Sequence, residues 1–198
     1  GILAAIVGFA SQSAFSNIIS GIFLVIFRPL SVGDRVKIGQ LYTGDVEDIT
    51  LRHVIIKDFE NRRIVIPNTV ISNEVIINST LTDEKICMFL ELGISLEANI
   101  DLAQKIMREE ATQHPYCIDN RTPAELAKGE TSVMVRVMGI TELAVQLRAY
   151  AWAENPNNGF DLKCDVLKSI KNRFDREGVE LAMPLRLVSY RNSPNPTA

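Results

Sequence analysis

The chain has 198 residues, a formal net charge of −3 at pH 7 and 46% hydrophobic residues. This length and composition predict one or two compact domains with a buried core. The near-neutral charge argues against a strongly basic surface, so no nucleic-acid partner is expected. The three cysteines are far apart and odd in number, which argues against a disulfide framework and favours a reducing, cytosolic setting for the soluble part.

The N-terminal stretch from Gly1 to Phe27 carries no charged side chain. As an α-helix it would be about 40 Å long, enough to cross the roughly 30 Å hydrocarbon core of a bilayer. Arg28 and Pro29 follow at once; a cation suits the membrane surface, and proline cannot continue a helix. We therefore predict a transmembrane helix over residues 1–28. Because the stretch begins without Met or a basic segment, we interpret it as a fragment that starts inside a helix rather than as a signal peptide.

Small residues and uncharged polar residues both occur in this predicted helix. The small ones, at a spacing that lets helices approach closely in lipid, are Gly1, Ala4, Ala5 and Gly8. Polar groups in hydrocarbon are costly unless they bond to a neighbour or face water. The polar ones are Ser11, Gln12, Ser13, Ser16, Asn17 and Ser20. A ring of identical helices around a pore explains both sets, and a plain membrane anchor is the alternative.

Residues 29–80 change to the two-residue alternation of short strands. The expected strands cover residues 32–39, 45–49, 52–57, 62–67 and 74–78, with a short turn after Pro67 and Asn68. Five short strands joined by tight turns indicate a small, strongly curved β-barrel.

Residues 81–179 are predicted to form an α+β domain with a mixed sheet, resembling a ferredoxin-like unit. Its expected strands are residues 85–95, 122–129, 131–140 and 142–152, and its expected helices are residues 99–113 and 160–177. Residues 155–159 are predicted to be a loop, and Gly178 a helix cap. Residues 180–198 are expected to be a last extended segment and a tail.

The sequence displays no catalytic or metal-binding motif. His53 and His114 lie far apart, and neither has a second ligand at metal-binding spacing. There is no CxxC pair and no glycine-rich phosphate loop. We therefore expect no enzymatic activity, no cofactor and no metal.

The stretch from Gly8 to Gly39, together with IVIPN at residues 64–68, resembles the mechanosensitive channel of small conductance (MscS) family. The resemblance is dense over the first eighty residues and continues by element order to about Tyr190. It implies a homo-heptamer in which this helix is the third transmembrane helix and lines the pore. It also implies a Sm-like β-domain, a ferredoxin-like α/β domain and a C-terminal strand in an inter-subunit β-barrel, which together form a hollow cytoplasmic cage.

The resemblance also implies roles for single residues. Ala5 and Phe9 correspond to the pore constriction, and Gly1, Ala4 and Gly8 to helix–helix packing. Gln12, Ser13 and Gly21 correspond to hinge positions. Asn17 matches an asparagine that contacts the β-domain, here at Asn68 and Thr69.

The implied function is a valve of the inner (plasma) membrane that opens under membrane tension and releases ions and small solutes on hypo-osmotic shock. Two further transmembrane helices are expected to precede this chain in a multi-pass protein. The alternative is a membrane-anchored cytosolic scaffold or ligand-binding domain, and an anchored enzyme domain is a weaker one. A seven-fold ring would favour the channel, and a stable monomer the anchor.

Overall fold

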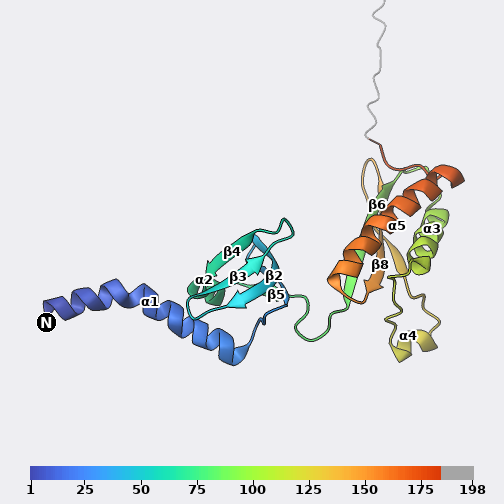
Figure 1. The fold of residues 1–198 in the computed structure, drawn as a ribbon. Helices are drawn as coiled ribbons and strands as arrows, with labels where there is room; N and C mark the ends of the chain where they lie inside the picture. The colour runs from blue at the N-terminus through green and yellow to red at the C-terminus, as the bar shows by residue number, and fades with distance from the viewer. Residues whose placement is uncertain (184–198) are drawn as a thin grey trace, which may run out of the picture. The chain divides into compact units, whose positions relative to one another are not determined.

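The computed structural model describes residues 1–183, and for residues 3–6 it describes the backbone alone. The chain divides into two compact units, residues 1–86 with 154–157, and residues 87–153 with those from 158 onward. The predicted fold class, an apolar helix followed by an α+β chain, is confirmed (Figure 1).

The first element, α1 (Ile2–Phe27), is one continuous helix. Its segment Val7–Phe27 is long and apolar enough to cross a membrane, judged by length and composition. Arg28 ends the helix in the left-handed conformation (φ 48°, ψ 52°) and donates its backbone N–H to the carbonyl of Leu24 at 3.0 Å. The helix therefore stops directly before Pro29, as expected from a residue that cannot continue it.

The β-domain is a five-stranded antiparallel sheet in the order β4-β3-β2-β1-β5. Its strands are β1 (Arg35–Ile38), β2 (Tyr42–Ile49), β3 (His53–Lys57), β4 (Arg63–Pro67) and β5 (Ile76–Asn78). The sequence predicts a turn after β4, but a six-residue helix, α2 (Asn68–Asn73), forms there and connects the two edge strands. Alternate strand residues such as Val54 and Ile56 are fully buried in a core that includes Ile71 of α2 and Leu24 of α1.

The second unit has a three-stranded sheet in the order β6-β8-β7. Its elements are β6 (Ile86–Ile94), α3 (Ile100–Gln113), α4 (Pro123–Ala127), β7 (Met134–Ile140), β8 (Val145–Ala153) and α5 (Pro156–Glu177). The helix predicted over residues 160–177 is confirmed as α5, and its apolar stripe is buried at Leu162, Val166, Ile170 and Phe174. Together with α3, this stripe forms the core against the sheet (Figure 1).

Two local predictions for this unit are wrong. Within residues 122–129, the helix α4 forms instead of a strand, because Thr122 and Glu125 make a capping box. The Thr122 Oγ1 accepts the Glu125 N–H at 3.3 Å, and the Glu125 carboxylate accepts the Thr122 N–H at 2.7 Å. Residues 155–159 are not a loop, because α5 already begins at Pro156. Proline suits the first helical position, where its fixed φ is helical and no N–H is needed.

The predicted C-terminal strand and tail, residues 180–198, are described only as far as residue 183. Leu181 forms an antiparallel bridge with Ile94, and the Ser95 N–H donates to the carbonyl of Glu180 at 2.9 Å. Gly178, the predicted helix cap, has φ 73°. The remainder of this segment lies outside the described residues.

Arg173 links α5 to α3. Its guanidinium lies 2.6 Å from Glu109, 3.1 Å from Glu110 and 2.5 Å from Glu177, and its side chain is 19% exposed. Hydrogen bonds to Glu177 and Glu109 raise the pKa of Arg173 above its ordinary value, so the group stays charged. Its loss would leave three carboxylates close together, with Lys105 at 4.0 Å from Glu109 as the remaining cation among the described residues.

We expect Arg173→Gln to lower the free energy of unfolding of this unit by about 1–2 kcal/mol, because it removes charge-assisted hydrogen bonds between two core helices. Trp152 is the only tryptophan and lies in β8, so its fluorescence reports unfolding of this unit. Lys171→Gln is the matched control, since Lys171 only pairs with Asp175 on the exposed face of α5. Equal losses in the two variants would contradict a linking role for Arg173.

Candidate functional site: the long helix and its junction with the β-domain

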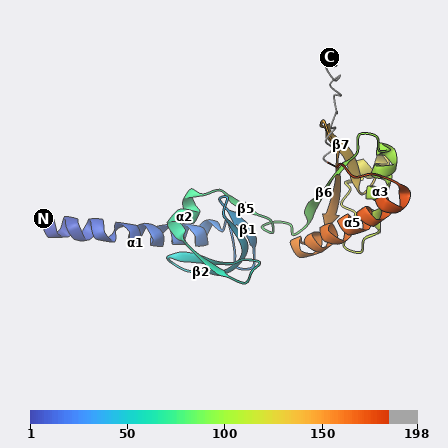
Figure 2. The same ribbon diagram turned by 90° about the horizontal axis from the view of Figure 1, so that it is seen from above.

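The helix α1 has one side covered by the β-domain and one side uncovered by the described residues. Asn17, Gly21 and Leu24 are spaced by four and three residues, so they share the covered face. Phe9 and Phe15 lie in the N-terminal half, where their side chains are 78% and 64% exposed. In Figure 2, α2 lies beside the C-terminal half of α1, while the N-terminal half continues past the β-domain.

Asn17 connects α1 to the start of α2. Its Oδ1 accepts hydrogen bonds from the Thr69 N–H and from the Thr69 hydroxyl, both at 3.1 Å. The first N–H groups of a helix have no partner within the helix, and α2 has no side-chain cap of its own. Asn17 therefore supplies, from another helix, the acceptor that a capping side chain would normally provide.

Asn68 fills the space between α1, α2 and the β2–β3 loop, and it is fully buried. Its Nδ2 donates to the carbonyl of Thr50 at 3.0 Å and to that of Asn17 at 3.4 Å. Both neighbours are acceptors, which determines that the amide nitrogen points toward them. The Oδ1 of Asn68 accepts no hydrogen bond from any described residue.

Gly21 is buried where α1 packs against the β-domain. A Cβ atom on Gly21 would lie 2.4 Å from Nδ2 of Asn68 and 2.6 Å from the carbonyl oxygen of Leu51. Backbone cannot move aside as a flexible side chain can, so any side chain at this position would push α1 away from the domain. In this conformation Gly21 permits close packing inside a continuous helix.

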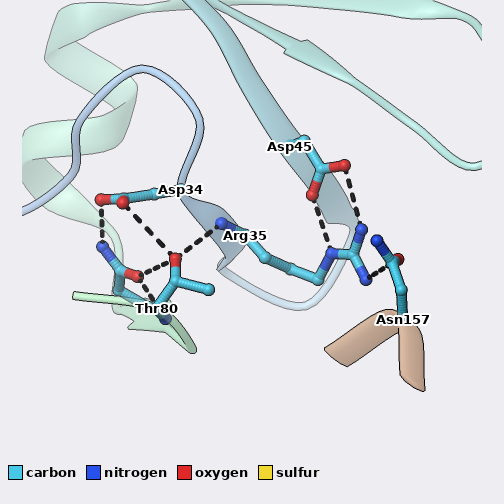
Figure 3. A network of polar contacts seen from close by, with 6 residues as sticks. Asp34, Arg35, Asp45, Thr80 and Asn157 are labelled. Atoms are coloured by element: carbon cyan, nitrogen blue, oxygen red, sulfur yellow. Dashed lines mark hydrogen bonds and ion pairs between the residues drawn. The ribbon is translucent and has the colours of Figure 1, made fainter. Parts of the chain in front are cut away.

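The exit of α1 is held by a second polar network, around Asp34 (Figure 3). Its carboxylate accepts the Ser31 N–H and the Nδ2 of Asn78, both at 2.7 Å. Thr80 joins the network and accepts the Arg35 N–H at 3.0 Å. The turn after α1 is thereby tied to both β1 and the end of β5.

A groove of about 550 Å³ runs along the uncovered side of α1. It is lined by Gly8, Phe9, Gln12, Phe15, Ser16 and Ile19. Gln12 and Ser16 follow Phe9 at three and seven residues, so all three side chains share one face. This face carries a large aromatic ring next to uncharged polar groups.

The other positions singled out in the sequence are placed as follows. Within the chain, a Cβ on Gly1 or Gly8 would meet no atom within 4 Å. Ala4 and Ala5 belong to residues 3–6, whose side chains are not described, so their roles stay predictions. Ser13 lies inside the continuous helix, and its carbonyl accepts the Asn17 Nδ2 at 2.9 Å.

The sequence analysis missed the contact of Leu51 with Gly21 and the network around Asp34. A buried glycine in a helix is a sequence signal for close approach, but the partner that approaches is visible only in three dimensions. His53 and His114 belong to different units, and among the described residues no three His, Cys, Asp or Glu side chains are placed to hold a metal ion.

We expect Gly21→Ala to speed hydrogen exchange of the Thr69 amide, because the added methyl displaces α1 from the acceptor that this amide uses. Overpacking of this kind corresponds to about 1–3 kcal/mol of opening free energy. Gly8→Ala is the control, since a methyl there meets no atom of the chain within 4 Å. An unchanged exchange rate of the Thr69 amide in the Gly21 variant would show that α1 accommodates the methyl group while the Asn17–Thr69 hydrogen bond is kept, which would contradict the prediction.

A double-mutant cycle between Asn17→Ala and Thr69→Val measures the junction itself. We expect a coupling free energy of about 1 kcal/mol, the usual worth of a neutral hydrogen bond. It is read from the exchange of core β3 amides such as Ile56. Pairing Asn17→Ala with Lys37→Ala, an exposed residue of β1, should be additive, because the two side chains share no partner among the described residues. Additivity in both cycles would mean that the hydroxyl bond contributes nothing.

Comparison with known proteins agrees with this geometry. Residues 13–81 match the family described as "Mechanosensitive ion channel, beta-domain", and residues 90–181 match "Mechanosensitive ion channel MscS, C-terminal". The chain is 28% identical over 192 residues to an MscS family protein of Archaeoglobus fulgidus. The aligned region covers 97% of this chain and 63% of that relative. It is 31% identical over 143 residues to the mechanosensitive channel MscK of Escherichia coli. That aligned region covers 72% of this chain and 12% of MscK.

The chain thus spans less than two thirds of either relative. Among solved structures, the closed-state crystal structure of Helicobacter pylori MscS superposes with a TM-score of 0.82 at 21% identity, covering 98% of this chain and 72% of that one. Arabidopsis thaliana MSL1 gives a TM-score of 0.66 at 18% identity, covering 92% and 64%. These likenesses establish the fold, and the two family matches lie end to end along most of the sequence. The chain belongs to the MscS family of mechanosensitive ion channels.

Proposed function

We propose that the protein is an ion channel opened by membrane tension, in which α1 helices from several identical copies enclose a pore. Seven copies is the number that the family resemblance suggests. On hypo-osmotic shock the channel would release ions and small solutes down their gradients. In this proposal the pore interacts with the ions and small solutes that pass through it, and it requires no cofactor.

The observation that carries this proposal is the division of α1 into two sides. One side is bound to the β-domain through Asn17 and Gly21, and the other presents Phe9, Gln12 and Ser16. A lipid-facing anchor would gain nothing from a polar face, since amide and hydroxyl groups are unfavourable in hydrocarbon. A water-filled lumen solvates these groups, which supports a pore-lining role over a plain anchor.

Phe9 is the gate in this proposal. A ring of phenylalanine side chains narrows the lumen and makes it apolar, and such constrictions stop conduction by excluding water. Ala5, one helical turn away, is the neighbouring constriction position. Because a ring of methyl groups leaves a wider passage, Phe9 would form the narrowest part.

The junction suggests which part of α1 moves. Asn17 and Gly21 hold the C-terminal half of the helix to the β-domain, and the Asp34 network holds its exit. Bending at Gly21 would break contacts on both of its sides, whereas Gln12 and Ser13 lie in the half that extends past the domain. We therefore place the hinge at Gln12 and Ser13, and assign close packing to Gly21.

The proposal includes the membrane location of the family. Val7–Phe27 would cross the inner (plasma) membrane as one of several spans, and the β-domain and α/β domain would lie in the cytoplasm. Packing of neighbouring α1 helices would involve Gly1, Ala4 and Gly8. The family is one of channels, which supports the expectation that the chain has no catalytic activity.

We expect Phe9→Ser to lower the tension needed for opening and to produce a basal leak, because a hydroxyl ring wets more readily than a phenyl ring. The measurement is patch-clamp recording of the protein in cells that lack their own mechanosensitive channels. Val7→Ser is the control, since Val7 lies about 160° around the helix from Phe9 and is outside the lining of the groove. An unchanged threshold without leak in the Phe9 variant would remove Phe9 as the gate, and tension-insensitive patches with the unaltered protein would refute the channel.

A further inference from the structure

The second unit contains a cavity of about 380 Å³ that the pore does not use. It lies against Cys87 of β6, Met134 and Arg136 of β7, and Tyr150 and Trp152 of β8. The segment around α4 completes its wall with Asn120, Arg121, Glu125, Glu130, Thr131 and Ser132. Its volume falls at the lower end of the range of small-molecule sites, which suits a compact solute.

Two of the charged groups in this wall are already occupied. Arg121 pairs with Asp119 through bonds of 2.5 to 3.1 Å and also donates to the Glu130 carbonyl at 2.7 Å. This pairing lowers the pKa of Asp119 to about 2, so the pair persists at neutral pH. The Glu125 carboxylate accepts both the N–H and the hydroxyl of Thr122 at 2.7 Å. Both groups therefore serve to hold the α4 segment in place.

Two other charged groups, Arg136 and the carboxylate of Glu130, remain available. Among the described residues neither forms an ion pair within 4.0 Å, with each other or with a third group. Arg136 also lies directly opposite Arg148 in the β7–β8 ladder, and like charges facing each other are unfavourable. Arg148 is compensated by Glu91, whereas Arg136, as far as the described residues go, contacts the sulfur of Met134 at 2.8 Å and no carboxylate. An anionic group at Arg136 would relieve this repulsion.

The apolar part of the wall is aromatic. Tyr150 is held by an edge-to-face contact with Phe89, with ring centroids 5.2 Å apart, and Trp152 follows Tyr150 on the same face of β8. Aromatic rings attract ammonium groups at their faces, and a nearby carboxylate attracts the same charge. Burial raises the pKa of the Cys87 thiol, so Cys87 adds no charge at neutral pH. Within residues 1–183, the cavity thus combines a cation and an anion that form no ion pair with two aromatic rings.

We infer that this cavity binds a small zwitterionic solute, with its carboxylate at Arg136 and its ammonium between Glu130 and the rings of Tyr150 and Trp152. An anion alone would leave Glu130 without a partner, and a cation alone would leave Arg136 opposite Arg148. A molecule such as an amino acid or a betaine satisfies both ends within one compact volume. The inference rests on the second unit alone and stands whether or not the protein conducts ions.

The test is a titration of the whole chain in detergent with glycine betaine, followed by Trp152 fluorescence and by calorimetry. Trp152 is the only tryptophan of the chain, so its emission reports on this cavity directly. We expect a saturable change with glycine betaine and a weaker response to acetate or to tetramethylammonium, which each carry one of its charges. Arg136→Gln and Glu130→Gln should each weaken binding by about tenfold or more, which corresponds to the loss of one charge-assisted contact.

Lys171→Gln, on the exposed face of α5, is the matched control and should leave binding unchanged. The near-ultraviolet circular dichroism of each variant verifies that the unit remains folded. No saturable response to glycine betaine or to any of several amino acids would overturn the inference. A response to acetate that equals that to glycine betaine and persists in Glu130→Gln would overturn it as well, because the cavity would then be a simple anion site.

Discussion

The close approach of α1 to the β-domain is the constraint on which the rest of the first unit depends. Gly21 removes the side chain that would separate the two backbones, and Asn17, one turn earlier, supplies an acceptor to the exposed start of α2. A helix of six residues is too short to be stable alone, because nucleation is costly. Since α2 joins the two edge strands, the packing of α1 also helps to hold the sheet together.

This constraint divides α1 into two parts with different freedom. The part from Asn17 to Arg28 is attached twice, at the junction and at the Asp34 network, so it should move with the β-domain as one body. Among the described residues, no hydrogen bond joins the part before Asn17 to the β-domain. A force along the helix would therefore act on the boundary between the two parts, near Gln12 and Ser13.

The sequence predicts much of the fold because its apolar periodicity follows burial directly. The strands of the β-domain and the buried stripe of α5 follow from that periodicity alone. The errors arise where local capping or tertiary packing, rather than apolar periodicity, determines the secondary structure. The Thr122–Glu125 capping box favours a helix in a segment without a clear period, and α2 receives a hydrogen-bond acceptor from Asn17 of α1.

The same distinction holds for the candidate site. The family resemblance singles out Asn17, Asn68 and Thr69, and the structure places these residues in contact. It assigns Gly21 only a bending role, because a spacing pattern does not reveal that Leu51 lies beneath it. Contacts between residues distant in sequence depend on the loop that brings them together, and loop geometry is not encoded in periodicity.

Asn17 also connects the junction to the region where bending is expected. Its Oδ1 binds Thr69 twice while its Nδ2 binds the carbonyl of Ser13, so one side chain joins the β-domain to the turn before it. A glycine at position 69 would offer only its N–H, and the threonine hydroxyl therefore adds a second bond. Bending at Ser13 would move the carbonyl that orients the Asn17 amide and would thereby weaken the hydrogen bonds of Asn17 to Thr69. The proposed hinge and the junction would then be coupled through a single amide, and each state of one would favour a state of the other.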